Sequence, residues 1–165
     1  MLRIDLIVKR QEILFIIVGA LLALGASVNL YREANWQLDT PPDMIIFANE
    51  KQYKAERGGH GIRNYLSGMV AFYDTAYVPP RETVNVVGGS QIELKVVDPW
   101  KPAEVNLYLY TYPKLNITEL QLTKLSDYVY SVDIPEGDYQ LGVLASWQKW
   151  SGSASAYYYF RIVVK

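Results

Sequence analysis

Few residues in this chain have both the type and the spacing that catalysis needs. Ser146 and Lys149 match S-x-x-K, in which a lysine activates the serine nucleophile of penicillin-binding enzymes. That chemistry requires the serine at the start of a helix, together with S-D-N and K-T-G elements, and the sequence contains neither. Apolar residues alternate around Ser146 as in a strand, so we interpret the match to S-x-x-K as chance.

The one histidine, His60, lies within Gly58-Gly59-His60-Gly61, which predicts a loop. A histidine there could act as a base or a pH switch, although a lone loop histidine is more often solvated. The glycine run lacks the Lys and Ser/Thr of a phosphate-binding loop.

A group of acidic residues near predicted turns could offer oxygen ligands to calcium. It consists of Asp127, Asp133, Glu136 and Asp138. Their spacing fits no calcium loop, so we expect solvated turn carboxylates. The chain has no cysteine, which excludes thiol chemistry and cysteine metal sites. We therefore predict no catalytic residue, no metal site and no cofactor, and we do not expect an enzyme.

The distribution of tyrosines predicts an interaction surface, and this hypothesis is stronger than any of the catalytic ones. If Leu107 and Leu109 face a core, alternation sends the neighbouring tyrosines to the opposite face, and the same logic applies to the final strand. The predicted interaction surface is Tyr108, Tyr110, Tyr112, Tyr157 and Tyr159. Tyrosine is enriched at protein interfaces. The alternative is that these rings only stabilise a half-exposed sheet through cross-strand pairing.

The elements that carry these residues are short alternating strands. Met44 to Ala48 is the first, and Thr83 to Val87 with Gln91 to Val97 predict a hairpin around Gly88-Gly89-Ser90. Tyr139 to Trp147 and Ala156 to Val164 place Trp147 and Phe160 on inward faces. The predicted fold is mainly β, an antiparallel immunoglobulin-like sandwich over residues 44–165.

A different kind of segment precedes these strands. Ile13 to Tyr31 is an uncharged run, about 28 Å long as a helix, close to the thickness of a bilayer core. We predict a cytoplasmic N-terminus over residues 1–12, a transmembrane helix over 13–31 and a stalk over 32–43. Lys and Arg lie mainly before the run, so the β domain is expected outside the plasma membrane. A cleaved signal peptide is the alternative.

The predicted helix has a face of small residues that would let another membrane helix approach closely. These residues are Gly19, Ala23 and Ser27. The expected partners are therefore the lipid bilayer and other membrane protein subunits. A net charge of −1 gives no basic stripe, so nucleic acid is not expected as a partner.

A resemblance supports this location. The Pro41-Pro42 start, the glycines at 58–61, the segment Asp74 to Pro80, the run from Val86, and a closing pattern from Trp150 to Val164 are similar to an uncharacterised extracytoplasmic immunoglobulin-like β domain. Such domains occur in membrane proteins and lipoproteins of Gram-positive bacteria. Cysteines often present in these domains are absent here. The resemblance implies a fold and a location, and no catalytic residues.

Two functions follow as expectations. The first is an accessory or assembly subunit of a membrane complex, held through its helix and its tyrosine face. The second is an extracytoplasmic module that binds or senses a cell-envelope component. The second would require a concave aromatic pocket rather than a flat patch.

Overall fold

The computed structural model describes residues 14–28, 41–74, 77–97 and 101–165. Its residues divide into two units, Met1–Trp36 and Gln37–Lys165, and all the described strands belong to the second. The strands are β1 (Asp43–Ala48), β2 (Lys51–Lys54), β3 (Glu56–Asn64), β4 (Val70–Tyr73), β5 (Thr83–Val86), β6 (Gln91–Val97), β7 (Glu104–Thr111), β8 (Thr123–Ser126), β9 (Val129–Ser131), β10 (Gly137–Lys149) and β11 (Gly152–Val164).

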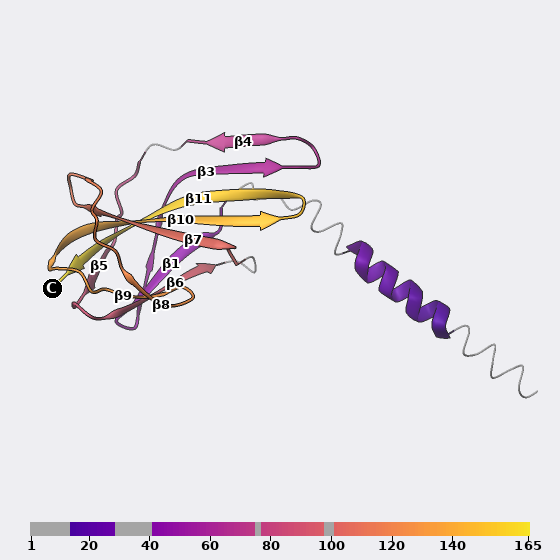
Figure 1. Ribbon diagram of the computed structural model, residues 1–165, viewed down its shortest axis with the longest axis horizontal. Coiled ribbons are helices and arrows are strands. Elements are labelled where there is room, and N and C mark those ends of the chain that lie inside the picture. The colour runs from indigo at the N-terminus through magenta and orange to yellow at the C-terminus, as the bar shows by residue number, and fades with distance from the viewer. Residues whose placement is uncertain (1–13, 29–40, 75–76, 98–100) are drawn as a thin grey trace, which may run out of the picture. The chain divides into compact units, whose positions relative to one another are not determined.

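The strands form two sheets, as Figure 1 shows. The first has the order β2-β1-β6-β9-β8, and the second has the order β4-β3-β11-β10-β7. Pairing within both paths is antiparallel, and β5 joins β11 as a parallel neighbour. The prediction of a mainly antiparallel β domain is confirmed, and the two sheets fit a β-sandwich.

The long pair β10–β11 carries the core of the domain. Its register runs without a break from Gly137 opposite Val164 to Lys149 opposite Gly152. Trp147 and Phe160 are both on the buried face, with 2% and 1% of their surface exposed. The inward register predicted for these two strands is therefore confirmed.

The predicted hairpin around Gly88-Gly89-Ser90 is wrong. β5 pairs with β11, whereas β6 lies in the other sheet between β1 and β9. A Ser90 N–H···O=C Val87 bond of 3.0 Å closes the turn, and Gly89 supplies the positive φ of 79° that glycine adopts readily. Val84 and Ile92 are each buried, in different sheets. A short turn therefore carries the chain from one sheet to the other. The spacing of residues in the sequence does not distinguish this crossing from a hairpin within one sheet.

The predicted loop at Gly58 to Gly61 is also wrong, because these residues lie inside β3. A Cβ at Gly58 would lie 2.6 Å from the Tyr159 ring, and one at Gly61 would lie 2.8 Å from the Phe72 ring. The glycines are thus required by close approach of aromatic side chains rather than by a turn. Local propensity favours a loop here because it takes no account of aromatic side chains that pack on the strand from elsewhere in the chain.

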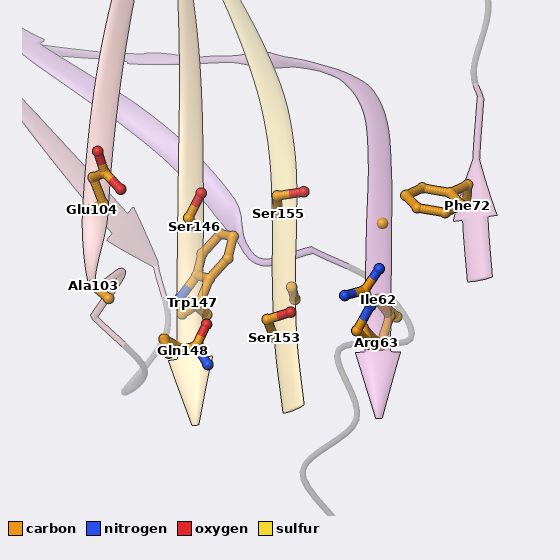
Figure 2. Close-up of a pocket in the computed structure, with 12 residues that line it drawn as sticks. Ile62, Arg63, Phe72, Ala103, Glu104, Ser146, Trp147, Gln148, Ser153 and Ser155 are labelled. Carbon is orange, nitrogen blue, oxygen red and sulfur yellow. The ribbon is translucent and has the colours of Figure 1, made fainter. Parts of the chain in front are cut away.

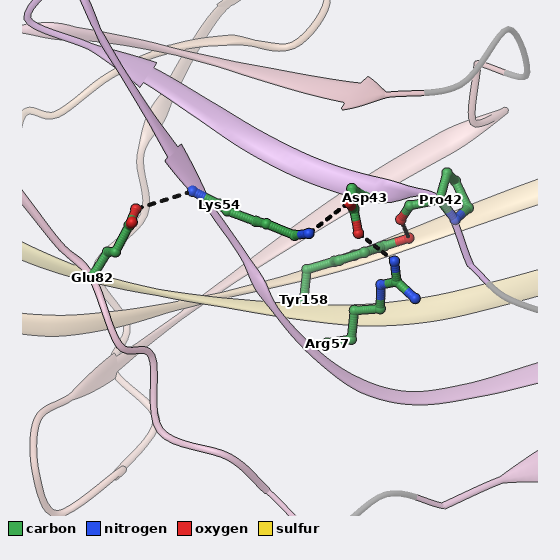
Figure 3. Close-up of polar contacts among 6 residues, drawn as sticks. All are labelled: Pro42, Asp43, Lys54, Arg57, Glu82 and Tyr158. Atoms are coloured by element: carbon green, nitrogen blue, oxygen red, sulfur yellow. Dashed lines mark hydrogen bonds and ion pairs between the residues drawn. The ribbon is translucent and has the colours of Figure 1, made fainter.

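The first strand is fixed at its start by contacts to both sheets (Figure 3). The Tyr158 hydroxyl, buried on β11, donates to the Pro42 carbonyl at 2.8 Å. The next residue, Asp43, accepts hydrogen bonds from Lys54, at 2.7 Å, and from Arg57 of β3. These bonds lower the pKa of Asp43. The last residues of the predicted stalk therefore belong to the domain.

The N-terminal unit contains a helix over residues 14–28, and the ends of the predicted membrane span lie outside the described residues. Within the described part of the chain, no helix has the length and apolar character needed to cross a membrane. In this helix Ser27 donates to the Ala23 carbonyl at 2.8 Å. Apart from the helix's own backbone, none of the described residues has an atom within 4 Å of a Cβ built on Gly19.

The buried register gives a prediction for stability. Phe160→Ala should lower the free energy of unfolding by about 3–5 kcal/mol, because it leaves a cavity in the centre of the core. Chemical denaturation of the full chain in mild detergent, followed by circular dichroism, would measure it. Phe72→Ala is the control, since Phe72 is 79% exposed and its loss should change stability little. Equal effects of the two substitutions would contradict the assigned register.

Candidate functional site

The predicted tyrosine surface lies on the outer face of the second sheet, opposite the core. Tyr108 of β7 and Tyr159 of β11 flank Gly142 of β10 in one cross-strand row. Tyr110 lies beside Gln140 in another row, and Tyr157 lies beside Leu144. Tyr157 is 40% exposed, whereas the other four tyrosines of the predicted set are half-buried.

Gly142 brings the tyrosines of β7 and β11 together although β10 separates those strands. A Cβ on Gly142 would lie 3.1 Å from the Tyr110 ring and 3.7 Å from the Tyr159 ring. The glycine therefore leaves room for both rings above the central strand. Burial raises the pKa of Tyr110 and of Tyr159, and neighbouring tyrosines add to the effect, so both remain neutral hydroxyls.

A residue outside the predicted set completes this face. The Tyr77 hydroxyl donates to Oε1 of Gln140, which is only 3% exposed although it points away from the core. The Tyr77 ring also meets the Tyr159 ring edge-on, with centroids 5.4 Å apart. Tyr77 thus covers the Gln140 side chain and donates a hydrogen bond to its buried carbonyl oxygen.

Tyr112 follows the end of β7, where its amide donates to the Asp138 carbonyl at 3.0 Å. The Arg161 guanidinium stands 4.3 Å from its ring centroid, in the geometry of a cation–π contact. Arg161 is itself held by two hydrogen bonds to Asp138, of 3.1 and 2.6 Å. Tyr112 therefore packs against the Arg161–Asp138 ion pair.

Tyr157 and Tyr159 form part of the wall of a groove of about 510 Å³, called the aromatic groove here. Its other aromatic residues are Phe72, Tyr73 and Tyr77, and its floor includes Gly61 and Ser155. The His60 ring stacks on Tyr73 with centroids 4.5 Å apart. His60 is thus an aromatic neighbour in a strand rather than a solvated loop residue.

A second groove of about 480 Å³ continues from the first and shares Gly61, Phe72 and Ser155 with it. Figure 2 shows its side chains, and we call it the serine groove. Ser146, Ser153 and Ser155 form its floor, and Glu104 lies at one side. Asn106 donates to the Glu104 carboxylate at 3.0 Å. Arg63 adds a positive charge on β3.

Both grooves follow from one cross-strand row of residues. Reading from β7 to β4, the row is Glu104, Ser146, Ser155, Gly61 and Phe72. The three central positions carry small side chains or none, so the sheet is hollowed between Glu104 and the Phe72 ring. Sequence reasoning missed this row because its members come from five strands. Serines and glycines at alternate positions of β3, β10 and β11 could have indicated that one face of the sheet carries small side chains.

The other sequence candidates are not brought together. Ser146 and Lys149 are three residues apart on β10, so their side chains leave opposite faces of the strand. Asp138 is paired with Arg161, and Asp127 lies 3.3 Å from Lys124. Among the described residues, no group of three or more His, Cys, Asp or Glu side chains could hold a metal ion.

A separate apolar surface lies at one end of the domain, where the β3–β4 and β10–β11 turns meet. The Tyr65 amide donates to the Ser151 carbonyl at 2.8 Å, which holds the two turns together. The exposed side chains of this apolar tip are Tyr65, Leu66, Met69 and Trp150. The Tyr65 hydroxyl accepts from Gln148 at 3.3 Å, so the tip adjoins the end of the serine groove.

The contact between Tyr77 and Gln140 gives a prediction. Tyr77→Phe should lower the free energy of unfolding by about 1–3 kcal/mol, because the buried Gln140 carbonyl loses its donor. Thermal and denaturant unfolding of the full chain would measure the change. Tyr157→Phe removes a hydroxyl from an exposed ring and should have almost no effect. If both variants unfold like the parent protein, Tyr77 does not stabilise this face.

Comparison of the chain with protein-family models, with curated proteins and with solved structures gave no match in any of the three. The resemblance noted in the sequence therefore stays a prediction. The two grooves and the residues that form them are therefore the basis for inferring a function.

Proposed function

We propose that this protein is a non-catalytic binding module, held on the outer side of the plasma membrane, that takes up a cell-envelope component in its two grooves. The observation that carries the proposal is the hollowed row from Glu104 to Phe72, bordered by exposed aromatic rings. A concave site with aromatic walls and a few polar groups is typical of ligand-binding sites. A docking face for a subunit would need no such hollow.

We infer further that the sandwich is immunoglobulin-like. β6, β9 and β8 lie in one sheet and β7, β10 and β11 in the other, an arrangement that matches the strand order of that fold. The Tyr139 hydroxyl, at the start of β10, donates to the Pro135 carbonyl at 3.1 Å. This contact has the geometry of the tyrosine corner of immunoglobulin domains. Because one fold can carry many functions, the grooves and not the fold support the proposal.

The membrane location rests on the charge pattern of the N-terminal segment. Residues 13–31 carry no charge, and the basic residues Arg3, Lys9 and Arg10 precede them.

The second candidate function is an accessory subunit of a membrane complex, docked through its helix and its tyrosine face. The exposure of Tyr157 favours this candidate, because large exposed aromatic residues are frequent anchors of interfaces. The open small-residue face of Gly19, Ala23 and Ser27 would accept a membrane helix. This candidate predicts that the protein is recovered in a stoichiometric complex with a membrane protein rather than with envelope fragments.

The location can be tested with single cysteines, since the chain has none of its own. Val87 is exposed on the domain, so Val87→Cys should react with a membrane-impermeant maleimide in intact cells. Lys9→Cys should react only after lysis. The reverse pattern would contradict the proposed orientation. Release of the domain into the medium would instead support cleavage as a signal peptide.

Envelope binding can be tested by sedimentation with envelope fragments that detergent has freed of membrane. The full chain should sediment with them, and Phe72→Ala combined with Tyr157→Ala should reduce the bound fraction about fivefold or more, because both rings border the grooves. Trp150→Ala is the matched control, an exposed aromatic residue outside both grooves. Recovery only in a stoichiometric complex with a membrane protein would favour the accessory subunit.

A further inference from the structure

The two grooves form a site suited to an extended molecule rather than a compact one. They share Gly61, Phe72 and Ser155, so the two grooves adjoin on one face of the sheet. The row from Glu104 to Phe72 crosses four strand-to-strand steps, about 19 Å at the usual strand spacing. Both grooves are open along their length. A chain of several linked units would fit here without entering the core.

The walls favour a ligand with flat C–H faces. Phe72 is 79% exposed on β4, and its ring reaches from β4 toward Gly61 (Figure 2). Tyr157, on the other side of β3, is 40% exposed. The face of an aromatic ring is electron-rich and attracts polarised C–H groups. Pyranose rings present such C–H groups on their flat faces, so they stack on aromatic side chains.

The floor favours a ligand with many hydroxyl groups. Ser146 and Ser155 each offer a hydroxyl that both donates and accepts, whereas the Ser153 hydroxyl bonds to Tyr65. Glu104 can only accept, and Arg63 can only donate. This mixture of donors and acceptors suits the hydroxyl groups of a ligand, because each hydroxyl can donate one hydrogen bond and accept others. An acyl chain would leave these polar groups without water or partners, which is costly.

The charges around the grooves argue against a polyanion. The lining carries Arg63 as its positive charge, against the carboxylates of Glu104 and Asp74. A nucleic acid or a highly phosphorylated polymer requires several basic residues along its path. An uncharged chain requires none.

From these observations we infer that the two grooves bind an extended, uncharged oligosaccharide, with sugar rings stacked on Phe72 and Tyr157 and their hydroxyls on the serine floor. This inference rests on the proposed function and names the chemical class of its ligand. The stacking residues come from β4 and β11, with glycine-containing β3 between them. Gly61 of β3 gives the Phe72 ring room to lie close to the strand, on the side of β3 opposite Tyr157.

The test is titration of the full chain, in mild detergent, with hexasaccharides of β-1,4-linked N-acetylglucosamine, β-1,4-linked glucose and α-1,4-linked glucose. Calorimetry would measure affinity, and intrinsic tyrosine and tryptophan fluorescence would give a second readout. We expect at least one of these sugars to bind. Phe72→Ala and Tyr157→Ala should each weaken that binding about tenfold or more. Trp150→Ala should leave it unchanged, and far-ultraviolet circular dichroism should show all variants folded.

The results separate this inference from the proposed function. If none of the three sugars binds, or if all variants bind equally, the oligosaccharide inference is overturned. Sedimentation with envelope fragments that persists in that case would keep the proposed function and assign the grooves to another envelope component. Failure of both experiments would overturn both proposals.

Discussion

The alternation of side chains along β10 and β11 is the constraint on which the rest of the domain depends. The two strands pair over their full length, and their inward residues, including Trp147 and Phe160, occupy the centre of the core. Because successive side chains leave opposite faces, burial of these residues fixes which side chains face outward. Ser146, Ser155 and Tyr157 are therefore presented to solvent as a consequence of core packing. A slip of one residue would exchange the core and the candidate site.

Small residues then shape that outer face. Gly58, Gly61 and Gly142 each lie beneath an aromatic ring that a larger side chain would displace. Glycine in a strand normally weakens it, because it contributes no packing and loses more backbone entropy on folding. Here the rings that lie over the glycines restore contact area. The glycines therefore determine where the aromatic rings lie on the outer face, beside the two grooves.

The polar contacts of the domain serve mainly to join its parts. Tyr158 and Asp43 fix the first strand to the second sheet, and Tyr77 covers Gln140 on the outer face. Each of these hydrogen bonds satisfies a group that is buried or partly buried, where an unpaired polar atom is costly. They use residues distant in the sequence. Tyr77 is thereby held over the sheet, where it lines the aromatic groove.

The sequence by itself determined the alternation of the long strands, the inward positions of Trp147 and Phe160, and the outward positions of the tyrosines. These features follow from a period of two, which is local and can be read from consecutive residues. Only the tertiary structure decided that β5 and β6 belong to different sheets, that Gly58 to Gly61 form a strand, and that Glu104, Ser155 and Phe72 share one row. Those outcomes depend on which distant strands become neighbours, and pairing between distant segments leaves no periodic signal in a single sequence.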